Sequence, residues 1–208
     1  MAKMMATMDL KNLLHAIFWI PVIYFGDILM ICVYSILLLL FAGLNPLIFL
    51  KKYLPAMISA FTLSSSNAAL PSSMKACEEI GISKKIYSFS LPLGSTINMD
   101  GSCITLMVTA MFFAKIFGIP ITGSVLFSLF ISIMILSVGS PGVPGGVLVC
   151  ITLLVPQIGI PAEAASIVMG MYPLVSMMQT CANVTGDAVV SAIVAKKENE
   201  LDVAKYHS

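Results

Sequence analysis

The segment GSTINMDG, residues 94–101, interrupts an otherwise apolar stretch that runs from Ile86 to Phe117. An α-helix rises about 1.5 Å per residue, so this stretch is long enough to cross a bilayer core of about 30 Å. Its centre nevertheless carries an asparagine, an aspartate and two glycines. Backbone groups freed by a break in hydrocarbon each cost several kcal/mol unless they find partners. The segment therefore predicts a membrane helix that is broken at its centre and needs polar partners there.

The composition places the whole chain in a membrane. Of its 208 residues, 59% are hydrophobic and only 10% are charged, against roughly a quarter charged in an ordinary soluble domain. The sequence contains no arginine and its net charge is +1, so no strongly basic surface exists to attract nucleic acid. The five cysteines lack the close spacing of a zinc site and are better explained as small packing residues.

Two other stretches are too short to cross a membrane and are broken by turn-forming residues. An apolar arm from Leu54 to Leu63 runs into SSSNAALP (64–71), and a second arm continues to about Ile82. Another apolar arm runs into SVGSPGVPGG (137–146) and then returns. About ten residues reach only about 15 Å, and Pro and Gly invite the chain to turn back. We therefore predict two re-entrant hairpins, over residues 45–82 and 121–158.

The remaining chain completes an all-α integral membrane fold. We expect one single membrane transport domain over residues 1–208, with spans over 16–44, 86–117 (broken) and 163–195 and a polar cytoplasmic tail over 196–208. This amounts to about three transmembrane helices plus two oppositely oriented hairpins in an inverted-repeat arrangement with unwound helix centres. The first span holds one acid, Asp27, and its sequence position leaves open whether that acid is functional or a packed polar contact.

Lysine placement predicts the orientation of this fold. If the first hairpin opens to the cytoplasm, the predicted inner loops and tail collect Lys51, Lys52, Lys75, Lys84, Lys85, Lys196 and Lys197. The outer loops near residues 118–123 and 157–162 carry no lysine. Cytoplasmic loops are enriched in lysine, so we expect a multi-pass protein of the plasma membrane with a cytoplasmic C-terminus.

The broken segments carry groups suited to cations and carboxylates. Carbonyl oxygens at Gly94, Thr96 and Asn98 are hard ligands for Na⁺, and Asp100 and Asp187 supply the charge that a buried cation needs. The half-helices that follow Ser66 and Pro144 would point their amides inward, where the positive end of the helix dipole favours an anion. The alternative is that both aspartates merely cap helices or pair with polar neighbours.

Four motifs resemble the dicarboxylate/amino acid:cation symporter family, which has the glutamate-transporter fold. They are SSSNAALPSSM (64–74), GIS..IYSFSLPLGSTINMDGS (81–102), SPGVPGG (140–146) and NVTGDAVVSAIVAK (183–196). The resemblance covers nearly the whole chain. It implies an elevator mechanism, in which a mobile transport domain moves against a fixed trimeric scaffold. It also implies that the chain is the C-terminal half, with the N-terminal scaffold half absent, and Lys3 and Lys11 on the predicted outer side agree with missing spans.

The resemblance also implies which residues bind the cargo. For Na⁺ it implies one site of Gly94, Asn98, Asn183 and Asp187, a second of Asn98 and Asp100, and a third of Thr96, Ser137, Val138 and Ser140. For the substrate it implies Ser65, Ser66, Ser102, Val143, Gly145, Gly146, Ser176, Gln179, Thr180 and Asn183. Within that set the Ser65 and Ser66 amides and Asn183 would hold the main carboxylate, and the second hairpin tip would act as the gate.

Two departures from the family pattern bear on specificity. Gln179 stands where members that carry acidic substrates have an arginine, so the bidentate clamp for a second carboxylate is missing. Ser176 stands where amino-acid carriers have an aspartate that pairs with the substrate ammonium. We therefore expect Na⁺-coupled symport of a small carboxylate-bearing solute, a neutral amino acid or a monocarboxylate, with Gln179 hydrogen-bonding the remainder.

Several alternatives stay open at this point. They are symport of a dicarboxylate or acidic amino acid, a transport-incompetent fragment or half-carrier that needs a scaffold partner, and an ion channel. An enzyme is not expected, because the only histidines, His15 and His207, lie near the termini, away from the serine cluster. We expect Na⁺ as coupling ion, no organic cofactor, membrane lipid around the protein, no nucleic acid, and a homotrimer once a scaffold half is supplied.

Overall fold

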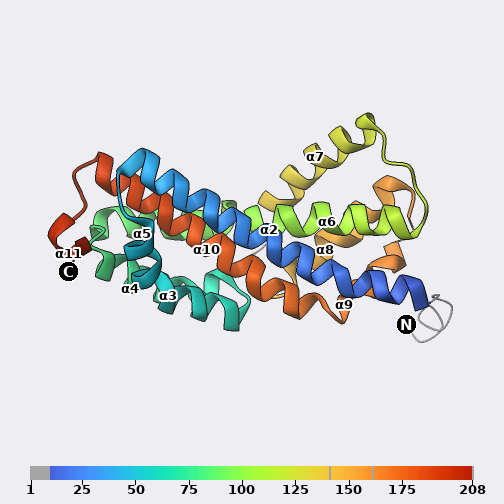
Figure 1. Ribbon diagram of the computed structural model, residues 1–208, viewed down its shortest axis with the longest axis horizontal. Helices are drawn as coiled ribbons and strands as arrows, with labels where there is room; N and C mark the ends of the chain where they lie inside the picture. Colours follow the sequence, from blue (N-terminus) through green and yellow to red (C-terminus); the bar gives the residue numbers. More distant parts are fainter. Residues whose placement is uncertain (1–9, 141, 161, 208) are drawn as a thin grey trace.

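The computed structural model describes residues 10–140, 142–160 and 162–207, and the longer elements of regular structure in these ranges are helices (Figure 1). The longer helices are α2 (Leu10–Ala42), α3 (Pro46–Leu63), α4 (Ser66–Ile80), α5 (Lys84–Ile97), α6 (Asp100–Ile116), α7 (Gly123–Val138), α8 (Gly146–Leu154) and α10 (Tyr172–Lys197). Shorter turns are η1 (Val155–Ile158), η2 (Ala162–Ala165), α9 (Ser166–Met169) and α11 (Val203–His207). The prediction of an all-helical chain is confirmed for these residues. Lys3 lies outside them, as does the side chain of Lys11.

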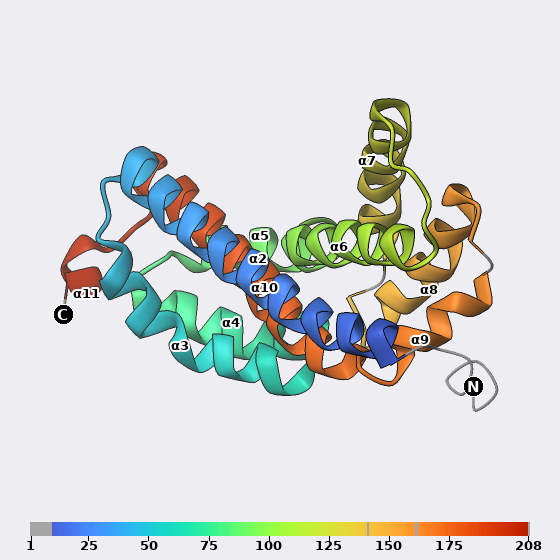
Figure 2. The same cartoon turned by 45° about the vertical axis from the view of Figure 1, so that its right-hand side comes forward.

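Helices α2 and α10 lie side by side along the length of the molecule (Figures 1 and 2). The buried residues of α2 form one stripe, which is Trp19, Ile23, Asp27, Tyr34, Leu38 and Ala42. Their spacing of four and seven residues keeps them on one helix face. The opposite face of α2 exposes large apolar side chains, as expected for a helix surface that contacts lipid or another protein.

The first hairpin, α3 and α4, turns on consecutive serines. Helix α3 ends at Ser64, whose φ of 49° reverses the chain direction. Ser65 then begins α4, and its hydroxyl accepts a hydrogen bond from the Ala68 amide at 3.2 Å. A serine N-cap of this kind stabilises a helix start by about 1 kcal/mol. The sequence SSSN therefore forms both the end of one helix and the start of the next.

The second hairpin, α7 and α8, points toward the first from the opposite end of the molecule (Figure 1). Helix α7 projects away from α6 in Figure 2. The turn between α7 and α8 contains Gly145, which has a left-handed φ of 83° and caps the start of α8. Insertion of the two hairpins into a membrane from opposite sides stays a prediction.

Two apolar clusters divide the interior. One gathers α3, α4 and α5 around Tyr53 and Ala188, and the other gathers α6, α7 and α8 around Leu106 and Val175. Helices α2 and α10 contribute to both. Between the clusters lies a set of buried polar residues that we call the polar seam. Its members are Asp27, Ser102, Thr105, Gln179, Thr180, Asn183 and Asp187.

The spans differ from the sequence prediction in two respects. Within the ranges that the structure describes, two helical stretches, rather than about three, are long and apolar enough to cross a membrane by length and composition, namely Phe18–Ala42 and Lys84–Ile116. The region predicted as one span over 163–195 instead breaks before Tyr172, and α10 carries too many polar residues to count as apolar.

The unwound helix centres are also fewer than predicted. Among the described residues, the interruption falls at Asn98 and Met99, between α5 and α6, as the GSTINMDG segment predicts. The predicted second unwound centre is wrong, because α10 continues as a regular helix through Asn183 and Asp187. Its polar side chains hydrogen-bond within the bundle, so the backbone needs no break to satisfy them.

The tail predicted as polar folds back onto the first hairpin. Leu201 forms an antiparallel bridge with Ile82, and the Ser83 amide donates to the Glu200 carbonyl at 2.9 Å. Lys85 Nζ lies 3.0 Å from Glu200 Oε1, and hydrogen bonds from Lys85 and Ser83 hold the pKa of Glu200 below its usual value. Tyr206 is fully buried and donates to the Asn45 carbonyl at 2.7 Å. The tail thus joins the end of α10 to the base of the hairpin.

Gly81 should be essential to this junction. Its φ is +100°, and a Cβ there would lie 2.6 Å from the Asp202 carbonyl oxygen. We expect Gly81→Ala to lower the free energy of unfolding by about 1–3 kcal/mol, from backbone strain alone, with the clash adding to it. Thermal unfolding of the purified chain measures this. Gly159→Ala is the control, because Gly159 also has a positive φ (+78°) but open space around it. Equal losses in both variants would contradict the role of the tail contact.

Candidate functional site

The tips of the two hairpins meet near the middle of the molecule. The Ser65 hydroxyl donates to the Gly142 carbonyl at 2.8 Å, and the Asn67 amide donates to the same oxygen at 3.3 Å. A Cβ on Gly142 would lie 2.7 Å from the Ser95 carbonyl oxygen of α5. Only glycine allows this approach, so the two hairpins and α5 converge at residue 142.

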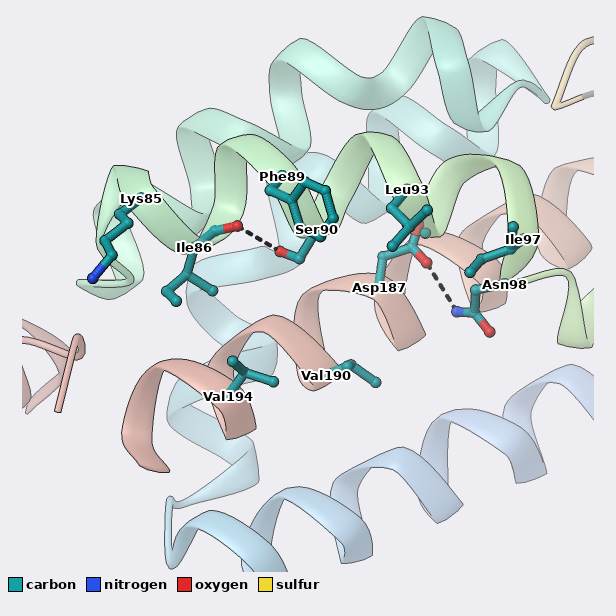
Figure 3. A pocket seen from close by; sticks show the side chains of 11 residues that line it. Lys85, Ile86, Phe89, Ser90, Leu93, Ile97, Asn98, Asp187, Val190 and Val194 are labelled. Carbon is teal, nitrogen blue, oxygen red and sulfur yellow. Dashed lines mark hydrogen bonds between the residues drawn. The ribbon is translucent and has the colours of Figure 1, made fainter. Parts of the chain in front are cut away.

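The break between α5 and α6 is tied to α10 by two asparagines. Asn98 Nδ2 donates to Asp187 Oδ1 at 2.9 Å and to the Asn183 carbonyl at 3.2 Å. The Gly101 amide at the start of α6 donates to Asn183 Oδ1 at 2.8 Å. Figure 3 shows Asn98, just after the end of α5, and Asp187 on α10 pointing toward each other. We call Asn98, Asp100, Asn183 and Asp187 the acidic cluster.

Glycines allow the acidic cluster to close. A Cβ on Gly94 would overlap the Asp187 carboxylate, and a Cβ on Gly186 would overlap the Tyr34 hydroxyl. That hydroxyl, from α2, donates to Asp100 Oδ2. Three helices therefore reach the same point, and the two carboxylates are close enough to interact electrostatically.

The acidic cluster offers negative charge and oxygen atoms but no positive partner. The one ion pair among the described residues, Lys85–Glu200, lies in the tail junction. The described part of the chain also holds no group of three or more His, Cys, Asp and Glu side chains that could bind a metal ion. Two carboxylates, an amide oxygen and nearby carbonyl oxygens are the donor set of an alkali cation rather than of a transition metal.

The hydroxyl groups of the predicted third cation site, at Thr96, Ser137 and Ser140, do not hydrogen-bond to one another. Thr96 is exposed, and its hydroxyl donates to the Leu93 carbonyl of its own helix at 2.7 Å. The Ser137 hydroxyl likewise donates to Met134 O, and Val138 is half exposed. The Ser140 hydroxyl is buried and has no hydrogen-bond partner among the described residues. A cation site joining these four residues stays a prediction.

A narrow polar pocket of about 20 Å³ lies between the hairpin tips, α6 and α10. Seven residues predicted to bind substrate line it, namely Ser65, Ser66, Ser102, Val143, Gln179, Thr180 and Asn183. Gly145, Gly146 and Ser176 are not in the lining. The two glycines begin α8, and the Ser176 hydroxyl donates to the Pro173 carbonyl at 2.9 Å. The volume is about that of one water molecule, so the tips must part to admit a solute.

Gln179 presents one free acceptor to this pocket. Its Nε2 donates to Ser102 Oγ at 2.9 Å, which fixes the amide, and its Oε1 is buried with no hydrogen-bond partner among the described residues. A buried acceptor left unpaired costs about 1–3 kcal/mol. Asn183 Nδ2 is weakly paired as well, because it donates to the Met99 sulfur at 3.5 Å.

Sequence reasoning missed several residues of the site. The pocket is also lined by Ser64, Met99, Gly142, Val147 and Tyr172, and Tyr34 reaches the acidic cluster. Tyr172 was detectable, since it precedes Gln179 and Asn183 by seven and eleven residues, which places all three on one helix face. Tyr34 was not, because no local pattern in α2 shows which turn of α6 it faces.

An apolar groove of about 370 Å³ leads along α5 and α10 to the acidic cluster. Figure 3 shows its walls, with Phe89 and Leu93 on α5 facing Val190 on α10. Asn98 and Asp187 form its polar end. The cluster is therefore open on this side of the described structure.

The chain matches known transport proteins along most of its length. The model of the sodium:dicarboxylate symporter family matches residues 1–197. Neutral amino acid transporter A of Bos taurus is 33% identical over 195 residues, which is 93% of this chain and 34% of that protein. The proton/sodium-glutamate symport protein of Bacillus subtilis is 34% identical over 164 residues, 79% of this chain and 38% of that protein. The L-cystine uptake protein TcyP of Bacillus licheniformis is 30% identical over 208 residues, 99% of this chain and 45% of that protein. The chain thus spans less than half the length of these relatives.

The close approach of Gly94 to Asp187 gives a test with an unusual sign. In a helix, Gly→Ala normally stabilises by about 0.5–1 kcal/mol. We expect Gly94→Ala to destabilise instead, because the new methyl group displaces the Asp187 carboxylate. Thermal unfolding of the purified chain measures the change. Gly123→Ala, at the first residue of α7 with open space around it, should be neutral or stabilising. A stabilised Gly94→Ala would show that the acidic cluster is not packed as described.

Proposed function

Because the chain belongs to the sodium:dicarboxylate symporter family, we propose that it is the substrate- and ion-binding half of a Na⁺-coupled symporter for a small carboxylate-bearing solute. The observation that carries this proposal is the adjacency of two unlike sites. The acidic cluster around Asn98 and Asp187 shares Asn183 with the polar pocket between the hairpin tips. A cation bound in one therefore influences a solute bound in the other. The relatives reported above are transporters, in agreement with the prediction that the chain is not an enzyme.

Sodium binding would neutralise the negative charge of the acidic cluster. Asp187 with the carbonyl oxygens of Gly94, Asn98 and Asn183 forms the first proposed site, and Asp100 with Asn98 forms the second. Asp187 is buried and Asp100 is partly buried. Holding two such carboxylates without positive partners is unfavourable, and a cation removes that cost. Since Asn98 already bonds both Asp187 and Asn183, cation binding would order the break and hold Asn183 in place. This coupling is the proposed basis of symport. Thr96 with Ser137, Val138 and Ser140 is retained as a third proposed site.

The solute's carboxylate would bind where two helix N-termini face each other. Helix α4 begins at Ser66 and α8 at Gly146, and the positive ends of both dipoles favour an anion between them. Asn183 Nδ2 has only a sulfur partner, so a carboxylate would be a stronger acceptor for it. Opening of the second hairpin, which contacts the body less than the first does, is the proposed gate.

The rest of the solute would meet Gln179. Its free Oε1 accepts a hydrogen bond, which suits an ammonium, hydroxyl or amide donor. A second carboxylate would face this carbonyl oxygen and gain no donor from it. We therefore favour a neutral amino acid, then a monocarboxylate, over a dicarboxylate or acidic amino acid. Gly145, Gly146, Ser176 and Thr180 are retained as proposed substrate-binding residues.

The proposed transport cycle would also involve a scaffold. In the proposed elevator mechanism this domain moves against a scaffold, which the relatives' greater length can accommodate. The exposed apolar face of α2, with Phe18, Phe25 and Leu40 each about two thirds exposed or more, would then contact scaffold or lipid. A homotrimer in the plasma membrane, with the C-terminus cytoplasmic, completes the proposal.

Sodium should stabilise the chain through Asp187. A ligand at about 100 times its dissociation constant adds about 2.7 kcal/mol to the free energy of unfolding. We expect NaCl, but not choline chloride, to raise the unfolding temperature of the wild type. Asp187→Asn should abolish most of this shift, whereas Glu79→Gln, an exposed carboxylate on α4, should leave it unchanged. Equal responses to the two salts in the wild type would refute Na⁺ binding.

Gln179 should set which solute binds. Gln179→Arg supplies the bidentate donor that a second carboxylate needs, so we expect it to gain Na⁺-dependent binding of aspartate or succinate and to lose neutral amino acids. Calorimetric titration in NaCl measures both classes of ligand. Gln179→Leu, which removes the acceptor without adding charge, should weaken neutral ligands and gain nothing. Tight aspartate binding by the wild type would contradict the proposed specificity.

A further inference from the structure

Asp27 is a buried acid that the proposed transport sites do not use. It lies on α2, its side chain is fully buried, and neither carboxyl oxygen has a hydrogen-bond partner among the described residues. It is the ninth residue after Phe18 in the stretch Phe18–Ala42 that is long and apolar enough to cross a membrane. At about 1.5 Å per residue this places it about 14 Å from that end, close to the middle of a bilayer core.

Asp27 is separate from the acidic cluster. The α2 residue that reaches Asp100 is Tyr34, which is seven residues from Asp27, or about 10 Å along the helix. Asp27 instead lies between the two apolar clusters, because Ile23 belongs to one and Tyr34 to the other. It is thus the second carboxyl group in the polar seam, besides Asp187, and it has its own surroundings.

The helices packed around Asp27 bring no positive charge to it. On α10 the nearby titratable group is Cys181, and on α2 itself it is Tyr24, whose hydroxyl donates to the Leu174 carbonyl at 2.7 Å. On α6, the two titratable groups have other partners than Asp27, since Asp100 contacts Tyr34 and Cys103 contacts Ser137.

Close packing between α2 and α6 seals the carboxyl group from solvent. A Cβ on the adjacent Gly26 would lie only 2.8 Å from the Ile104 side chain. Trp19 Nε1 donates to the Thr109 hydroxyl at 3.1 Å, which fixes the same two helices further along. Among the described residues Asp27 therefore has no charged partner, and its side chain has no exposed surface.

An ionised carboxylate in such a place costs many kcal/mol, so a cation must neutralise it. Sodium needs a shell of several oxygen ligands, and no hydroxyl or amide group of the described residues is hydrogen-bonded to Asp27. A proton needs no ligand beyond the carboxyl group. We propose that Asp27 is a proton-binding site within the membrane domain, separate from the Na⁺ sites and occupied while α2, α6 and α10 are packed together.

The proton would be linked to the packing of α2. Because the packed state binds the proton more tightly than the unfolded chain does, the stability it contributes is present at low pH and is lost as pH rises. Release of the proton would require water to reach Asp27, which means loosening α2 from α6 and α10. This inference goes beyond the proposed function and depends on it only for the membrane setting.

Infrared spectroscopy of the purified 208-residue chain in lipid tests the proposal directly. We expect the wild type at neutral pH to show the carbonyl stretching band of a protonated carboxylic acid, and Asp27→Asn to lack that contribution. Asp202→Asn removes an exposed carboxylate that accepts a hydrogen bond from the Lys205 amide. This variant should leave the band unchanged. No difference between the wild type and Asp27→Asn would overturn the proposal. Asp27→Ala provides the same comparison if the asparagine variant does not fold.

Thermal unfolding across pH in choline chloride provides the second readout, and it does not require Na⁺ binding or transport. The unfolding temperature of the wild type should fall from mildly acidic to alkaline pH. The corresponding fall in Asp27→Asn, whose amide resembles the neutral acid, should be smaller. Asp202→Asn should follow the wild type. A pH response in Asp27→Asn equal to that of the wild type would overturn the proposal, whereas a missing Na⁺ shift would bear only on the proposed symport.

Discussion

A helix that breaks inside an apolar bundle must find partners for the backbone groups that it frees, and the rest of this structure depends on how that demand is met. At the break between α5 and α6, the Gly101 amide donates to the Asn183 side chain on α10, and the Asn98 side chain donates to Asp187 and to the Asn183 carbonyl of the same helix. Each neutral hydrogen bond contributes only about 1 kcal/mol net, but leaving the groups unpaired in a dry interior costs more than that. The break is therefore stable only while α10 holds this register against it.

The polar seam that results separates two apolar cores, and this separation gives the domain its capacity to bind. Each core holds one hairpin, so the hairpin tips project into the seam and meet at Gly142. Carboxylates on one side of Asn183 and helix N-termini on the other favour opposite charges. Cation and carboxylate can thus be bound close together in a largely buried region, where the lower dielectric constant lets each strengthen binding of the other.

Sequence reasoning predicted what glycine, proline and serine patterns determine locally. The break at Asn98, the serine turn of the first hairpin and the glycine-rich turn of the second are all of this kind. It did not predict features that depend on distant contacts. Continuity of α10 through its polar residues follows from partners on α5 and α6, and the folded tail follows from packing of Tyr206 against the first hairpin. The same holds for Asp27. Its position within a membrane span could be predicted, but the close packing of Gly26 against Ile104 beside it could not.

The most direct test of the central claim is an experimental density map of the protein in NaCl, at a resolution that shows bound ions, with a matched map in choline chloride. The account predicts density in NaCl among the oxygens of Gly94, Asn98, Asn183 and Asp187, and its loss in choline. Helix continuity through Asn98 in the map, or identical density in the two salts, would contradict it.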